Sequence, residues 1–185
     1  MERTVENVRF NVLRNALYHT GRRMAFERWN RFFNFLVVVL GAAATGGIIT
    51  EIGINAIWPA GAVAVVGAAQ LVFDFGRMSR DHQTLQREYY HLLADIEQNI
   101  APTQQDVAAW YAKMTRIAGD EPPVLRAKDA KAYNDAIDAL EWGREERLKI
   151  PFWHVLFGWI WPFEGYNYKK FCELPGKNEP KQIAA

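Results

Sequence analysis

Cysteine and net charge are both nearly absent from the sequence. Cys172 is the one thiol among 185 residues, which excludes an internal disulfide framework. The 22 Lys and Arg residues almost balance the 21 Asp and Glu residues, and the formal net charge is +1. Because positive charge is not in excess, nothing draws the chain as a whole to nucleic acid, and we expect no nucleic-acid partner.

Signatures of nucleotide, cofactor and metal chemistry are absent from the sequence as well. There is no GxxxxGK[ST], no GxGxxG and no HExxH. The histidines are scattered along the chain, at His19, His82, His91 and His154. We therefore expect no enzyme, no catalytic residue, no cofactor and no metal site. Residues 1–31 are polar and rich in arginine, without the apolar core of a signal peptide, so we expect no such peptide.

Long apolar stretches, by contrast, are present. Residues 32–50 and residues 52–73 carry no charge, and Glu51 stands alone between them. Each stretch has about the 20 residues that an α-helix needs to cross a bilayer. The alternative is a pair of buried helices in a soluble core, but the rest of the chain has too little apolar sequence to cover them. The sequence therefore predicts a two-helix transmembrane hairpin over residues 32–75.

The short connection between the two stretches has the composition of a turn at a membrane surface. Gly53 and Asn55 favour a turn, and Pro59 suits the first turn of the second helix, where its missing N–H costs nothing. Trp58 stands where an interfacial anchor is expected.

The distribution of arginines predicts the orientation of the hairpin. Five arginines lie between Arg14 and Arg31, before the first stretch, and Arg77, Arg80 and Arg87 follow the second, whereas the connection has no Lys or Arg. By the positive-inside rule, both termini are cytoplasmic and the connection is outside.

Both stretches are rich in small residues, which let helices approach closely in lipid. Ala60, Ala64 and Ala68 recur at four-residue spacing on one face of the second stretch. We expect the two helices of one chain to pack together, and we expect copies of the chain to associate as a homo-oligomer.

A few polar groups lie at membrane depth, and they are the candidates to line a pore. They are Gln70 and Asp74, four residues apart on one helical face, together with Thr45. Thr45 can bond its own helix, which is the simpler interpretation. A carboxylate inside lipid is costly and usually functional. Asp74, however, lies close to the inner surface with Arg77 one turn on, so the interpretation as a boundary residue is favoured.

After the second stretch an apolar seam alternates four and three residues apart, which predicts a helix ending near Ile100. The seam is the candidate oligomer interface and consists of Met78, His82, Leu85, Tyr89, Leu92 and Ile96. His82 fits a packed, register-setting role better than a catalytic one.

Further helices complete the predicted cytoplasmic part. Residues 103–106, TQQD, resemble a capping box and begin a helix that ends at Gly119. Another helical pattern runs over residues 128–142, and the N-terminal residues are amphipathic. Because no stretch alternates like a strand, the predicted fold class is all-α.

An aromatic stretch at residues 151–163 is too short to span a membrane. Its tryptophans are candidate interfacial anchors, namely Trp153, Trp159 and Trp161. The stretch either lies in the inner-leaflet interface or at the base of the spans, or it forms an apolar plug on the cytoplasmic helices. The sequence leaves both interpretations open.

Four segments resemble the SLATT-domain family of two-span bacterial membrane effectors. They are RNALYHTGRRMAFERWNRF before the first stretch, LVFDFGRMSRDHQTLQREYYHLL after the second, RIAGDEPPVLRAKDAKAYNDAIDAL, and IPFWHVLFGWIWPF. The resemblance implies an effector that oligomerises and breaches the inner membrane when infection is sensed. It also implies a separate sensor or nucleotide-signalling protein as a partner. The family provides no catalytic residues to carry over.

The sequence thus predicts an all-α membrane protein in five parts. These are an amphipathic cytoplasmic helix (1–31), the transmembrane hairpin (32–75), a cytoplasmic helical domain (76–148), an aromatic interfacial segment (149–168) and a polar, disordered tail (169–185). The predicted function is that of a pore-forming or membrane-disrupting effector in anti-phage defence. The alternatives are a non-enzymatic membrane scaffold that recruits a cytoplasmic partner and a regulated ion channel.

Overall fold

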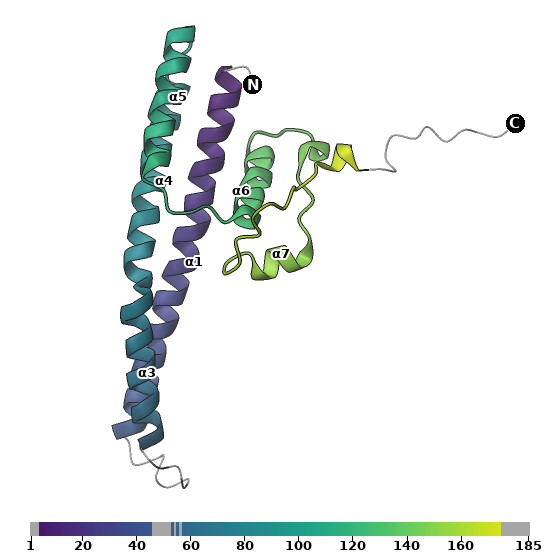
Figure 1. Ribbon diagram of the computed structural model, residues 1–185. Coiled ribbons are helices and arrows are strands. Elements are labelled where there is room, and N and C mark those ends of the chain that lie inside the picture. The colour runs from purple at the N-terminus through teal and green to yellow at the C-terminus, as the bar shows by residue number, and fades with distance from the viewer. Residues whose placement is uncertain (1–3, 46–52, 54, 56, 175–185) are drawn as a thin grey trace, which may run out of the picture. The chain divides into compact units, whose positions relative to one another are not determined.

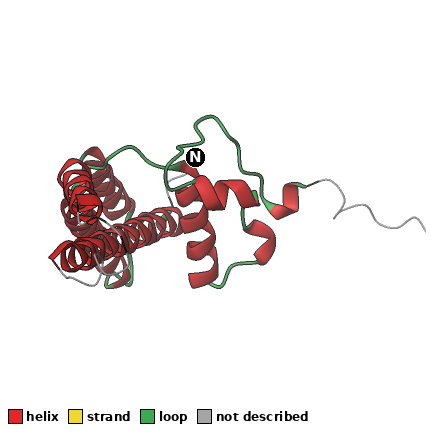
Figure 2. Cartoon of the chain, turned by 90° about the horizontal axis from the view of Figure 1, so that it is seen from below, coloured by secondary structure: helices red, strands yellow, loops and turns green. Residues whose placement is uncertain are grey.

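The computed structural model describes residues 4–45, 53, 55 and 57–174 (Figure 1). Its α-helices are α1 (Val5–Thr45), α3 (Ile57–Phe73), α4 (Phe75–Glu97), α5 (Gln104–Gly119), α6 (Arg126–Ala139) and α7 (Phe152–Phe157). Two short 3-10 helices, η1 (Arg144–Glu146) and η2 (Phe171–Glu173), complete the order. The described part contains no strand, only an isolated antiparallel bridge between Leu148 and Lys170 (Figure 2). The prediction of an all-α fold is confirmed.

Helix α1 runs from Val5 to Thr45 without interruption. The predicted boundary between a cytoplasmic helix ending at residue 31 and a span beginning at residue 32 therefore falls inside one continuous helix. The last residues of the first predicted span, 46–50, lie outside the described residues, as does most of the predicted connection.

The chain divides into two compact units, one of residues 22–83 and the other of residues 1–21 with 84–185. In the first unit, α3 lies alongside the second half of α1 (Figure 1). Asn55 precedes α3 and its Oδ1 accepts a hydrogen bond of 3.0 Å from the Ile57 N–H. Pro59 lies in the first turn of α3, the position for which the sequence predicts it.

In the second unit the start of α1 is buried on two faces. One face packs on α4 and α5, and the shared core consists of Val8, Val12, Ala16, Leu85, Tyr89, Leu92, Ile96, Val107, Trp110 and Ile117. The other face packs on α6, where Phe10 meets Ala136 and Ile137. Two apolar faces on one amphipathic segment explain why the start of α1 holds α4, α5 and α6 together.

Helix α5 begins at the predicted capping box. The Thr103 hydroxyl accepts a hydrogen bond from the Asp106 N–H at 3.2 Å, and Asp106 Oδ2 accepts one from the Thr103 N–H at 2.8 Å. These hydrogen bonds lower the pKa of Asp106. The capping box and the end of the helix at Gly119 are both confirmed.

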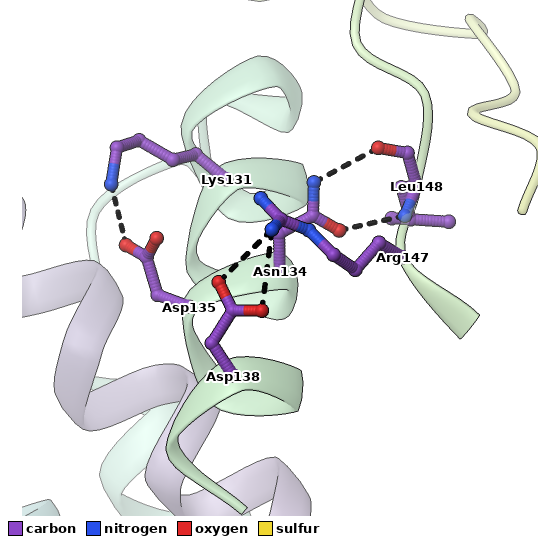
Figure 3. A network of polar contacts seen from close by, with 6 residues as sticks. All are labelled: Lys131, Asn134, Asp135, Asp138, Arg147 and Leu148. Carbon is purple, nitrogen blue, oxygen red and sulfur yellow. Dashed lines mark hydrogen bonds and ion pairs between the residues drawn. The ribbon is translucent and has the colours of Figure 1, made fainter. Parts of the chain in front are cut away.

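The chain after α6 is attached to that helix by a buried asparagine (Figure 3). Asn134 Nδ2 donates to the Leu148 carbonyl at 2.9 Å, and the Leu148 N–H donates to Asn134 Oδ1 at 2.7 Å. The Lys149 N–H then donates to the Lys169 carbonyl, and the Phe171 N–H donates to the Arg147 carbonyl. These bonds order residues 169–174, the described start of the predicted tail.

Candidate functional site

The candidate site begins with the surface of α3, which is apolar and exposed. Its large apolar side chains are among the most exposed in the described part, and they are Ile57, Trp58, Val65, Leu71, Val72 and Phe73. Leu71 is 85% exposed and Pro59 is the one buried residue of α3. Among the described residues, one helical stretch, Ile57–Glu97, is long and apolar enough to cross a membrane.

The apolar end of α1 has the same character as α3. Phe32, Phe35 and Val38 are 49%, 62% and 69% exposed. Within a soluble unit such side chains would be covered, because each carries a large unfavourable hydration free energy. Exposure on both helices at this scale is typical of surfaces that meet lipid.

The polar groups that the sequence predicts at membrane depth bond within the chain. Gln70 Nε2 donates to Asn34 Oδ1 at 2.9 Å, across α3 and α1. The Thr45 hydroxyl donates to the Gly41 carbonyl at 3.1 Å, in its own helix. Two of the three groups that the sequence proposes for a pore lining, Gln70 and Thr45, are thus hydrogen-bonded inside one copy of the chain, and their role in a pore stays a prediction.

Asp74 occupies the junction between α3 and α4. Its φ is +39°, a left-handed conformation that aspartate adopts more readily than most residues. Its Oδ1 accepts a hydrogen bond of 3.1 Å from the Arg77 N–H, as the first residue before a helix does. The Arg77 side chain instead reaches Asp81, with Nε 3.8 Å from Oδ2. Asp74 therefore ends one helix and caps the next.

An aromatic cluster holds α1 against the start of α4. The Phe75 ring has its centroid 5.2 Å from that of Phe33, and it stacks on Phe26 and Trp29 at 6.4 Å each. Phe26 also stacks on His82 at 5.5 Å. His82 is 4% exposed, in a packed environment that fits the role predicted for it.

The predicted oligomer seam is buried largely inside the chain. Leu85, Tyr89, Leu92 and Ile96 are each at most 7% exposed and belong to the core that α4 shares with α1 and α5. Met78, at 42%, is the exposed member. These contacts account for the 3.5-residue period within one chain, and contact between copies through the seam stays a prediction.

A buried polar cluster that the sequence did not single out lies at the end of this core. His19 is fully buried, and its ring stacks on Tyr89 with centroids 5.7 Å apart. Glu121 Oε1 lies 3.2 Å from His19 Nε2 and accepts a hydrogen bond from the Tyr89 hydroxyl. Burial, and then the hydrogen bond to Glu121, raises the pKa of Tyr89 above its usual value of 10.0.

The sequence does carry a signal for this cluster. Val12, Ala16 and His19 are spaced four and three residues apart, so His19 continues the buried face of α1. A histidine on such a face needs a polar partner on a neighbouring element, and Glu121 supplies it from the α5–α6 loop.

The predicted aromatic anchors on residues 151–163 are exposed. Trp153, Trp159 and Trp161 are 63%, 43% and 65% exposed. The segment is held from its inner side, where His154 Nδ1 lies 2.8 Å from the Tyr168 hydroxyl. Gly158 packs so closely on Ala127 that a Cβ at residue 158 would lie 2.7 Å from the Ala127 Cβ. The segment is therefore attached to α6 while its aromatic rings face outward.

No family model, curated protein or solved structure matches the chain.

Proposed function

We propose that the chain is an oligomeric effector of the bacterial inner membrane that forms a pore or disrupts the bilayer in anti-phage defence. The observation that carries the proposal is the exposed apolar surface of α3 and of the end of α1. In this proposal the end of α1 and α3 are the two spans of a hairpin. The resemblance to SLATT-domain effectors supplies the defence role and the separate sensor or nucleotide-signalling partner.

Self-association is the step that turns such a hairpin into a pore. Ala60, Ala64 and Ala68 are exposed, whereas Ala62 and Gly67 of the same helix are partly covered. The small-residue face therefore points away from α1 and leaves room for the backbone of a second copy. An assembly through this face needs no separation of the buried core.

The orientation of the hairpin is tested by chemical labelling. Asn55 lies in the predicted external connection and is exposed. We expect an Asn55→Cys variant, made in a Cys172→Ser background, to react with an impermeant maleimide in intact cells. Protection of the new thiol in intact cells, with labelling only after lysis, contradicts two cytoplasmic termini.

The pore is tested by membrane potential together with oligomeric state. We expect expression of the wild type to collapse the potential reported by a voltage-sensitive dye, and Ala64→Leu to reduce both the collapse and cross-linking between copies. Val65→Leu is the matched control, because it places the same side chain about 100° round the helix. A wild type that is oligomeric and leaves the potential intact overturns the pore.

A second candidate function is a membrane scaffold that recruits a cytoplasmic protein. The observation that favours it is the pairing of Gln70 with Asn34, which joins the two amides by a hydrogen bond within one copy of the chain. A scaffold is expected to retain a soluble partner during purification and to leave ion flux unchanged. A regulated ion channel would also change the membrane potential, but only after a signal that opens it.

A further inference from the structure

A pocket lies at the end of the aromatic segment of residues 151–163. It has a volume of about 640 Å³ and is lined by His154, Trp161, Pro162, Phe163, Glu164, Gly165 and Tyr166. Its size falls within the range of small-molecule sites. Four of the seven lining residues are aromatic rings, and one is a carboxylate.

The pocket is formed by a sharp turn of the chain. Phe163 has φ of +51° and Gly165 has φ of +77°, so two left-handed residues occur within three positions. A left-handed conformation is costly for a phenylalanine and commonly marks a functional site. The turn brings the Phe163 ring onto His154, with centroids 3.8 Å apart, and leaves the hollow beside them open.

The lining has the chemistry of a site for an organic ammonium ion. The faces of aromatic rings carry partial negative charge and attract alkylammonium groups, most strongly when several rings surround the cation. Glu164 adds a full negative charge, and the lining residues include no lysine or arginine. Tyr166 meets His154 edge to face at 4.4 Å, which holds two of the rings at different angles.

A cationic side chain at the start of α6 lies beside the same segment. The Arg126 backbone N–H donates to the Pro162 carbonyl at 3.3 Å, and the Lys128 side chain brings Nζ to 3.5 Å from the Val155 carbonyl. A positive group on the segment that carries the ammonium site matches a molecule with a phosphate beside its ammonium. The exposed rings of Phe152 and Trp153 supply an apolar surface for acyl chains.

We propose that this pocket binds the ammonium headgroup of a zwitterionic phospholipid, phosphoethanolamine or phosphocholine in type, at the surface of the inner leaflet. The ammonium lies against Trp161, Tyr166 and Glu164. The inference rests on the proposed membrane location, and it adds a lipid preference that the proposed spans do not provide.

Binding of the ammonium group is tested with the full chain in detergent. Choline is titrated by calorimetry against 3,3-dimethylbutan-1-ol, a neutral molecule of the same shape. We expect choline to bind at least about tenfold more tightly than the neutral molecule, and Glu164→Gln to remove most of this difference. Tyr166→Leu removes one ring, and Glu145→Gln is the control at an exposed carboxylate outside the pocket. Equal binding of the charged and neutral molecules overturns the site.

Lipid and soluble sources of the ammonium group are separated by native mass spectrometry. The full chain is equilibrated with equal amounts of phosphatidylethanolamine and phosphatidylglycerol. We expect the wild type to retain severalfold more phosphatidylethanolamine, and Glu164→Gln to lose the preference. Tight choline binding without any lipid preference overturns the lipid assignment and leaves a soluble ammonium compound as the ligand.

These measurements are independent of the proposed effector activity. If the chain binds the ammonium group and leaves the membrane potential intact, the pocket proposal is supported and the pore proposal is wrong. If the chain collapses the potential and binds neither choline nor phosphatidylethanolamine, the pocket proposal is wrong and the pore proposal is supported.

Discussion

Gln70 and Asn34 form a side-chain hydrogen bond of 2.9 Å between α3 and α1, two helices that are otherwise apolar over this region. In lipid neither amide has water as an alternative partner. The bond therefore fixes the register of the proposed hairpin as well as adding to its stability.

Removing one amide of this pair is expected to cost more than removing both. We expect Gln70→Leu to destabilise the hairpin by about 0.5–1.5 kcal/mol, because the Asn34 amide then lacks its partner. The double variant Asn34→Leu/Gln70→Leu is expected to recover most of the loss. Unfolding in bicelles by dodecyl sulfate measures both, and a double variant as unstable as the sum of the singles contradicts the pairing.

Substitutions at Asp74 are expected to follow backbone conformation. Because φ is +39°, Asp74→Val is expected to destabilise the chain by about 1–2 kcal/mol. Asp74→Asn keeps both the cap and the left-handed preference, and Asp74→Gly keeps the latter, so both are expected to be much milder. Equal losses for valine and asparagine, measured by unfolding in detergent, would show that the charge matters and the conformation does not.

Tyr89 is expected to make stability depend on pH in the alkaline range. Its pKa is raised in the folded chain, so the folded state keeps the phenol proton where the unfolded chain loses it. The contribution is complete below pH 10 and falls by up to about 1.4 kcal/mol per pH unit above it.

Unfolding of the full chain in detergent at pH 9 and pH 11 measures this fall. We expect Tyr89→Phe to reduce the difference between the two pH values. Tyr90→Phe, at the exposed neighbouring position, is expected to keep it. The same slope in wild type and Tyr89→Phe would assign the pH dependence to other groups.

Figure 3 shows a buried and an exposed polar contact of α6, and substitutions compare their contributions to stability. Asn134→Leu is expected to destabilise the unit that contains α6 by about 1–3 kcal/mol, because it leaves the Leu148 backbone groups without a partner. Lys131→Ala removes the exposed ion pair with Asp135 on the same helix and is expected to cost about 0.5 kcal/mol or less. Thermal unfolding followed by circular dichroism compares the two, and equal shifts would contradict the buried role of Asn134.

Much of the fold could be predicted because its signals are local. The capping box at Thr103 and Asp106, the end of α5 at Gly119 and the absence of strands from the described part all follow from short patterns. The left-handed conformation of Asp74, which divides α3 from α4, was not predicted. Hydrophobicity and helical period do not reveal that a single residue adopts a left-handed conformation. Aspartate is also common at helix boundaries, so the residue type does not identify this conformation.

The surroundings of the candidate site depend on contacts between distant residues, which local patterns do not specify. The seam around Leu85 and Leu92 has the same period whether it meets a second copy or the start of α1. His19 and Glu121 are far apart in the sequence, and the fold brings them together. The turn at Phe163 and Gly165, which opens the aromatic pocket, likewise has no clear local signal.

The buried core that joins Val8 and Val12 to Leu85 and Trp110 also constrains the order of events during synthesis. The ribosome makes the N-terminal partners first, then the apolar helices, and only later α4 and α5. The start of α1 must therefore leave the ribosome without its partners and wait until the apolar helices have been made. In the proposed membrane hairpin, insertion then precedes completion of this core, so a nascent chain that fails to insert carries an unfinished core and becomes a substrate for chaperones and proteases.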